Sequence, residues 1–438
     1  MSQYNLLYHS VDPDATNPNG YTSFDTLDFT LDFSQRALVA GTVRVEADME
    51  ILTGGAALLT QDRVACDHMI GGHAFFQSAV TTTLAQGVIE NSTFLPRYVK
   101  MKTSCTETAD DMNNSKYVCE LRSSDVKIQE TLMRRKCISD YGGGKLAGSD
   151  LPSNTAQGTA RRQTPGHLSS AFLSVSDGSD TGSVVQPLTS TANGADEGAG
   201  YALANNPEFF PLPDFSIKPH ICLNQPVGGS GLINYSTTGT IRVSLNLARA
   251  AEALYGPDVL ATTSYVLRNV RVCYVTVPEP PSQQPVSLRT TLCLKSALNS
   301  QLSNTSNRVP AVCDSVALSF IPLSRENSLN HNNTALELLP NVSRLQFMFN
   351  DSTSRYISYE LKHSPEIVAE GLKAMSVGTG SNNVRLDTLA ANKGYVAGLS
   401  FGEAIDLSQQ KFNIGVESQV LNTEPYTMFS YFSSVVSM

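Results

Sequence analysis

The densest group of candidate metal ligands in the sequence is formed by Cys66, Asp67, His68 and His73. Thiolate, carboxylate and imidazole groups bind zinc, and zinc sites combine three or four of them at the regular spacings of a helix or a knuckle. The spacing of these residues matches none of those patterns, and no second cluster completes the set. We therefore expect a loop of hydrogen-bonded polar residues, without a metal.

Two further segments contain residue types that bind calcium or phosphate. Asp110, Asp111, Asn113 and Asn114 carry oxygen ligands, but the 12-residue calcium loop with its central glycine and terminal glutamate is absent. The run GGGK at 142–145 lacks the first glycine and the Ser/Thr of a phosphate-binding loop, and no apolar strand leads into it. We interpret both segments as polar turns.

Nucleophile motifs are also missing, since the sequence contains no GxSxG, no HExxH and no paired Cys/His arrangement. We therefore predict no catalytic, cofactor-binding or metal-binding residues, and no enzymatic activity. A carboxylate pair for glycoside hydrolysis is defined by its distance in space and not in sequence, so that alternative stays open. The absence of Trp weakens it, because sugar-binding platforms commonly use Trp or Tyr faces.

The elements that would position any site are mainly strands. Several short stretches alternate apolar and polar residues with a period of two, most clearly TVRVEADMEI at 42–51. A strand presents successive residues to opposite faces, so this pattern indicates one buried and one solvated face. Many such strands predict an all-β sandwich or barrel with short helices. Strands are expected at 26–33, 42–51, 215–218, 240–247, 264–277, 315–320, 344–349, 411–417 and 426–436.

Short helices are predicted between some of these strands. Residues 248–254 form one, ended by Gly256 and Pro257, and Ser364-Pro365-Glu366 begins another that continues to about Met375. The segment 71–87 is ambiguous: its apolar spacing suits a helix, whereas three consecutive threonines favour a strand. We expect a short helix there. The aromatic residues near the C-terminus, Tyr426, Phe429, Tyr431 and Phe432, are interpreted as core and intersubunit packing instead of a binding stripe.

Proline and glycine content divides the chain into parts. The segment VPEPPSQQP at 277–285 has four prolines and predicts a stiff linker between two domains. Residues 139–205 are rich in Gly, Ser, Thr and Ala, and are either a projecting loop ordered by neighbouring subunits or a partly disordered insertion. We expect an arm at 1–20, a first domain at 21–276 that contains this loop, and a second domain at 286–438.

Charge and cysteine usage exclude several classes of function. Charged residues make up only 16% of the 438 residues, as expected for a protein that buries much surface against its own copies, and the net charge is −9. The basic clusters at 134–136 and 161–162 are short, so tight binding to nucleic-acid phosphates is not expected. No secretory signal or apolar span of about 20 residues is recognised, and the eight scattered cysteines are expected to be reduced.

Three segments resemble the double jelly-roll major capsid proteins of tailless icosahedral DNA viruses, the lineage of membrane-containing phages, polinton-like viruses, virophages and adenovirus hexons. They are GGHAFFQSAVTTTLAQGVIENSTFLPRY at 71–98, residues 239–277, and residues 394–432. The resemblance is one of pattern and order and covers both halves of the chain. It implies two eight-stranded jelly rolls side by side, joined by the proline-rich linker.

The resemblance also implies a function and partners. Three copies would form a pseudo-hexameric homotrimer that tiles an icosahedral shell around the genome, with 139–205 as a tower loop or a clasp between neighbours. The expected partners are other capsomers, vertex (penton) and minor capsid proteins, and an internal membrane, without sequence-specific nucleic-acid binding. The protein would be made and assembled inside the host cell and not secreted. Two alternatives remain: another virion protein, such as a vertex or spike subunit, or a tandem β-sandwich that binds or hydrolyses carbohydrate.

Overall fold

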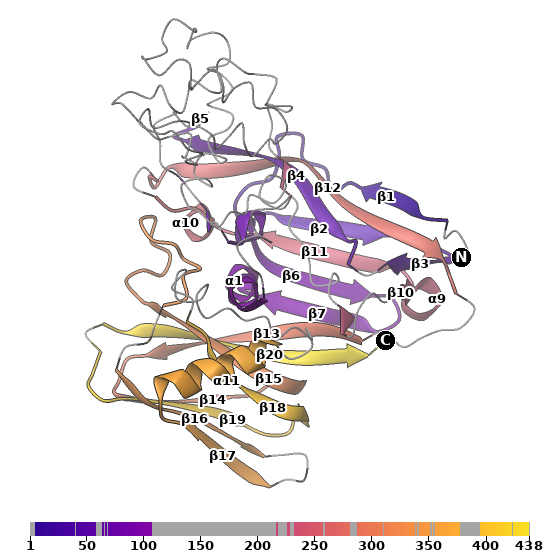
Figure 1. Cartoon of the computed structure of the whole chain (residues 1–438). Helices are drawn as coiled ribbons and strands as arrows, with labels where there is room; N and C mark the ends of the chain where they lie inside the picture. Colours follow the sequence, from indigo (N-terminus) through magenta and orange to yellow (C-terminus); the bar gives the residue numbers. More distant parts are fainter. Residues whose placement is uncertain are drawn as a thin grey trace, which may run out of the picture.

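In the described part of the computed structural model, four antiparallel sheets carry most of the regular structure (Figure 1). The expected insertion at 139–205 and the basic clusters at 134–136 and 161–162 lie outside this part. The structure describes residues 5–39, 41–57, 64, 66–67, 69–106, 216–217, 226–227, 232–256, 259–280, 287–309, 311–337, 339, 341–350, 353, 355–376, 395–422 and 424–437.

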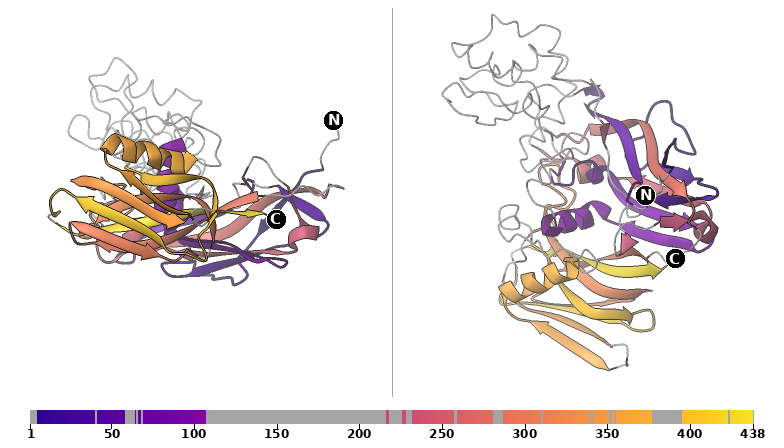
Figure 2. Two further views of the ribbon diagram at one scale, coloured as in Figure 1. Left: turned by 90° about the horizontal axis from the view of Figure 1, so that it is seen from below. Right: turned by 45° about the vertical axis from the view of Figure 1, so that its right-hand side comes forward.

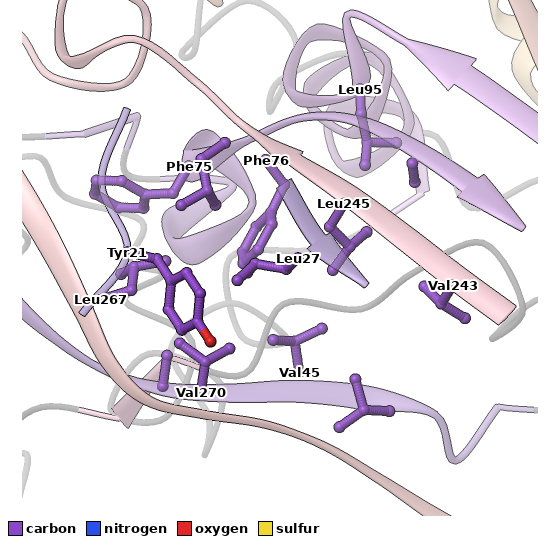
Figure 3. Close-up of a cluster of buried hydrophobic side chains, with 14 of the residues drawn as sticks. Tyr21, Leu27, Val45, Phe75, Phe76, Leu95, Val243, Leu245, Leu267 and Val270 are labelled. Carbon is purple, nitrogen blue, oxygen red and sulfur yellow. The ribbon is translucent and has the colours of Figure 1, made fainter. Parts of the chain in front are cut away.

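The first half of the chain forms two sheets that face each other. One sheet contains β1 (Leu7–Val11), β3 (Arg36–Val39), β4 (Arg44–Thr53), β5 (Ala56–Ala57), β8 (Ser216–Ile217), β10 (Leu232–Asn234) and β12 (Thr263–Pro278). The other has the order β2 (Thr26–Leu31), β11 (Ile241–Leu247), β6 (Phe76–Thr83) and β7 (Gly87–Thr93). Between them lies a core in which Val45 of β4 faces Leu27 of β2 and Leu245 of β11 (Figure 3).

The second half forms another pair of facing sheets with its own core. One sheet has the order β18 (Ala397–Asp406), β15 (Val312–Pro322), β20 (Tyr426–Ser437), β13 (Ser287–Leu298) and β9 (Pro226–Val227). The other has the order β14 (Leu302–Asn307), β19 (Phe412–Ser418), β16 (Val342–Asn350) and β17 (Tyr356–Leu361). Strand β9 is the one described strand that crosses between halves, since it precedes β12 in sequence but pairs with β13.

The two halves repeat one topology. In the first half, β1, β12, β4 and β8 are successive neighbours; in the second half, β13, β20, β15 and β18 are. The opposite sheets, β2-β11-β6-β7 and β14-β19-β16-β17, match in the same way. Each half is therefore an eight-stranded jelly roll in which two sheets hide each other's apolar faces. We call residues 7–278 the first roll and residues 287–437 the second roll.

An interruption in the first roll explains one of its three additional strands, β3; the other two are the short strands β5 and β10. Thr276 of β12 pairs with β1 on one edge and with β3 on the other, and Cys273 pairs with β1 and with β4 in the same manner. Strands β3 and β4 therefore follow one another along the same edge of β12, as one strand interrupted between Val39 and Arg44.

Most of the strands expected from alternation are confirmed. Burial in β11 alternates along Ile241–Leu247, with the apolar positions inside, and β12 and β20 span nearly the lengths predicted for them. The expected arm at 1–20 contains the paired strand β1. The expected linker at 277–285 lies partly outside the described residues, and its start belongs to β12.

The helix expected over 71–87 is wrong. Gly71–Phe75 forms a single 3-10 turn, and the chain then enters β6, which pairs with β11 and β7. The β-branched threonines at 81–83 fit a strand between two neighbours better than a helix. Leu84, which the helical spacing placed on a buried face, is exposed in the turn after β6.

Four helices complete the described structure: α1 (Leu95–Thr106), α9 (Tyr235–Thr238), α10 (Ala250–Ala253) and α11 (Ser364–Ser376). The predictions of α10 and α11 are confirmed, whereas α1 and α9 were not predicted. Helices α1 and α11 follow equivalent strands, β7 and β17, and lie near each other (Figures 1 and 2).

Gly371 allows α11 to lie directly on the second roll. A Cβ atom at this position would be 2.3 Å from the carbonyl oxygen of Val396 and 2.8 Å from the Cα of Ala397. We expect Gly371→Ala to lower the free energy of unfolding by about 1–3 kcal/mol, because overpacking against backbone outweighs the better helix propensity of alanine. Urea unfolding measures the change. The control is the reverse substitution at the exposed Ala369, because Ala369→Gly changes helix propensity without changing packing. If Gly371→Ala instead stabilised the protein by as much as Ala369→Gly destabilises it, the packing argument would be contradicted.

Candidate functional site at the junction of the two rolls

Helix α1 of the first roll is buried against the second roll, and this junction has a core of its own. Met101 and Cys105 of α1 pack with residues from the outer face of the β13-β20-β15 sheet and with Met375 of α11. The sheet is therefore apolar on both faces: one covers the second roll's core, and the other meets α1 and α11. This arrangement explains why β15 and β20 show little alternation in burial.

Aromatic side chains hold the start of α1 against β20. The hydroxyl of Tyr431 donates to the carbonyl of Phe94 at 3.0 Å, and the Phe94 and Phe429 rings meet edge to face at 5.1 Å. Burial raises the pKa of Tyr431 well above its ordinary value, so the phenol stays a hydrogen-bond donor. The packing role expected for the C-terminal aromatics is thus confirmed within the chain: Phe429 and Tyr431 pack at the junction, and Tyr426 and Phe432 in the second roll's core.

Arg97 extends from α1 into the loop that follows β15. Its Nη1 donates to the carbonyl of Ala335 at 2.8 Å, and its Nη2 donates to the carbonyl of Asn333. The guanidinium also lies over the ring of Phe429, 4.5 Å from the centroid. Burial lowers the pKa of Arg97, although nearby acidic groups act in the opposite direction. Such a group is tolerated inside a protein because its N–H donors have partners.

One turn further along α1, Lys100 forms a buried ion pair with Asp67. Nζ lies 2.9 Å from Oδ1, and the two side chains are 3% and 1% exposed. The other carboxylate oxygen accepts hydrogen bonds from Asn332 Nδ2 and Thr334 Oγ1, each at 2.7 Å. Asp67 therefore joins Lys100 of its own roll to the loop at 332–334 of the other roll. We call Asp67, Arg97, Lys100, Asn332 and Thr334 the junction network.

This arrangement accounts for the candidate metal ligands of the sequence. The carboxylate of Asp67 is occupied by the junction network, His73 Nδ1 contacts the carbonyl of Ile70 at 3.1 Å, and Cys66 Sγ lies 3.5 Å from the carbonyl of Gly71. His68, the segment 110–114 and the GGGK run lie outside the described residues. Within the described part, no cluster of three or more His, Cys, Asp or Glu side chains could hold a metal ion.

Two cysteines lie in the junction core without forming a disulfide. Burial raises the pKa of Cys105 and of Cys293 to about 12, so both remain thiols near neutral pH and react slowly. The five cysteines that the structure describes are free: Cys66, Cys105, Cys273, Cys293 and Cys313. None of the described helices is both long and apolar enough to cross a membrane.

Sequence reasoning did not find the junction network. Asp67 was considered only as a metal ligand, and Arg97 and Lys100 have the sequence context of ordinary surface charges. The one available signal was the apolar residues of 94–101, which recur at helical spacing around the two cations.

Comparison with known proteins identifies the architecture. No protein-family model matches the chain, and no curated protein matches it. Among solved structures, the Faustovirus major capsid protein superposes with a TM-score of 0.54 at 8% identity, covering 100% of this chain and 91% of that one. PBCV-1 VP54, as fitted into a reconstruction of the virophage Sputnik, gives 0.51 at 8% identity, covering 100% and 96%. The chain has the double jelly-roll fold of viral major capsid proteins. Both superpositions cover 100% of this chain, so both rolls belong to the shared architecture.

Proposed function

We propose that the protein is a major capsid protein whose homotrimers tile an icosahedral shell around a viral genome. The observation that carries this proposal is the doubled roll: two units of one topology lie side by side and are fixed by a buried junction. Three such chains supply six similar units, the number that a hexagonal tile needs. The whole-chain likeness to two viral capsid proteins supports the same assignment.

For the domain boundaries we keep those expected from the sequence, an arm at 1–20, a first domain at 21–276, a linker at 277–285 and a second domain at 286–438, with one extension. Strand β1 of the arm and the end of β12 at Pro278 are counted with the first roll, because β1 pairs with β12. The low content of charged side chains, 16%, fits a protein that buries its surface against copies of itself. A vertex or spike subunit has no need of two matched rolls. The proposed partners are neighbouring capsomers, vertex proteins, minor capsid proteins and an internal membrane. The location is the virion shell, after synthesis and assembly inside the host cell.

The experiment is the mass of the purified protein by light scattering, with negative-stain images of the same sample. We expect a particle of three chain masses with a hexagonal outline, or closed shells. A protein that stays monomeric at high concentration would contradict the capsid assignment, and glycan binding and hydrolysis would then be the next assays.

A further inference from the structure

The first strand of the chain is attached to the first roll around one histidine. Among the described strands β1 pairs with β12 alone, and His9 stands directly opposite Tyr274 in this pairing (Figure 1). The two rings stack with centroids 4.7 Å apart and planes 7° apart. Because Tyr274 is buried in the core of the first roll, His9 lies on the inner face of β1. Val11, two residues further on, packs partly against the same core.

A relay of hydrogen bonds joins His9 to strands β12 and β3. Arg36 Nε, at the start of β3, donates to Thr276 Oγ1 of β12 at 2.8 Å, and this oxygen lies 2.9 Å from His9 Nε2. All three groups have a partner when the hydroxyl accepts from Arg36 and gives its own proton to His9 Nε2. That arrangement requires a neutral imidazole. Thr276 is 0% exposed, so water offers its hydroxyl proton no other acceptor.

The charge closest to His9 is positive. Arg36 lies across β12 from β1, and its Nη2 also donates to the carbonyl of Asn5, just before β1, at 2.6 Å. Burial lowers the pKa of His9, and the charge of Arg36 lowers it further. The other titratable side chains on or beside the elements that contact β1 are Asp12, Asp14, Asp28, Asp32, Arg271, Cys273 and Tyr274. None of the described carboxylates among them acts on His9 strongly enough to oppose Arg36.

We propose that β1 is an acid-sensitive strand, which protonation of His9 releases from β12. A proton on Nε2 makes this atom a second donor to Thr276 Oγ1, next to Arg36 Nε. The buried hydroxyl proton of Thr276 then has no acceptor, and two cations share one oxygen. Release uncovers the edge of β12 from Val272 to Thr276 and the core beneath Val11. The inference goes beyond the proposed capsid function and does not depend on it, because all of these groups belong to one chain.

The direction of the pH dependence follows from proton linkage. In released β1, His9 titrates near its ordinary pKa of about 6.5, whereas in attached β1 its pKa is lower. The released strand therefore binds the proton more tightly. Strand β1 is fully held above about pH 6.5 and loosens as the pH falls below this value, by at most about tenfold per pH unit, because one proton is involved.

Hydrogen exchange of the full-length protein, followed by mass spectrometry at about pH 7.5 and pH 5.0, tests the inference. Rates are corrected for the intrinsic effect of pH on exchange. We expect the amides of β1 and of its partner segment 272–276 to lose protection by about tenfold at the lower pH, while β13 and β20 of the second roll keep theirs.

Two variants remove the proton site in different ways. His9→Phe keeps a ring that stacks on Tyr274, and His9→Gln keeps an oxygen that accepts from Thr276. Neither side chain titrates, so β1 should exchange at the same corrected rate at both pH values in each variant. The matched control is His331→Phe, at an exposed histidine of the second roll, which should retain the full acid response of β1.

Three outcomes would overturn the inference. They are equal protection of β1 at both pH values in the unmodified protein, an acid response that survives in either His9 variant, and an acid response that His331→Phe abolishes. Each of them leaves the capsid proposal standing, since that proposal is tested by the mass and outline of the assembled particle.

Discussion

Lys100→Met is expected to lower the free energy of unfolding by about 3–5 kcal/mol, because it leaves the buried carboxylate of Asp67 without its cation. The hydrogen bonds from Asn332 and Thr334 remain, but they do not neutralise the charge. Denaturant unfolding measures this loss, provided that the m-value, the slope of the unfolding free energy against denaturant concentration, stays the same in the variant. The variant should also separate the two rolls more readily, which limited proteolysis between them would report.

The matched control is Lys373→Met on α11, the equivalent helix. Lys373 also pairs with a carboxylate, that of Glu370, but its side chain is 65% exposed. An exposed pair contributes about 0–1 kcal/mol, so the control should change little. Adding Asp67→Asn to Lys100→Met should recover part of the loss, since the buried charge is then gone. Equal losses from Lys100→Met and Lys373→Met would show that burial of the ion pair does not matter.

Phe412→Ala is the second substitution with a large expected effect, about 3–5 kcal/mol, because it opens a cavity that rigid neighbours cannot fill. The ring is fully buried, stacks on Phe349 at 5.3 Å and meets Phe432 edge to face at 5.2 Å. These neighbours belong to both sheets of the second roll, so the cavity should loosen the contact between the sheets. Thermal unfolding with intrinsic tyrosine fluorescence measures the effect.

The control for this cavity is Phe24→Ala. Phe24 is exposed in the first roll, and its described ring contact is with the guanidinium of Arg249 at 5.2 Å. We expect a loss below about 1 kcal/mol there. Since the two rolls have separate cores, Phe412→Ala should shift the unfolding of the second roll more than that of the first. A uniform shift of a single transition would instead indicate that the junction unites the rolls into one cooperative unit.

The sequence predicted the strands better than the way they are arranged. Alternation of apolar and polar residues at 240–247 and 344–349 indicates which side chains of each strand face the core, and this property is local to the strand. The two jelly rolls were expected from the resemblance to double jelly-roll capsid proteins, and the structure confirms them. The residues themselves show no internal repeat, because β1 and β13, or β7 and β17, match in their pairing partners and not in their residues. Pairing between strands far apart in sequence leaves no periodic signal.

The junction escaped prediction for a different physical reason. Arg97, Lys100 and Asp67 are charged residues, which are almost never fully buried unless they are paired. Their partners lie more than 230 positions away for Arg97 and 33 positions away for the ion pair. Only the folded chain reveals those pairings. The wrong prediction of a helix over 71–87 has the same origin, since strand β6 is fixed by its pairing with β11 and β7 and not by the spacing of its own residues.

Arg97 also sets an order of events during synthesis. Both of its carbonyl acceptors, at Asn333 and Ala335, are translated more than 230 residues after Arg97 itself. A nascent first roll therefore carries a helix with an unsatisfied guanidinium and an apolar face, which water or a chaperone must cover in the meantime. Prematurely terminated chains retain this unfinished helix, whereas complete chains bury it. A chain that ends before residue 335 lacks an acceptor for Arg97, so burial of α1 distinguishes longer chains from such truncated products.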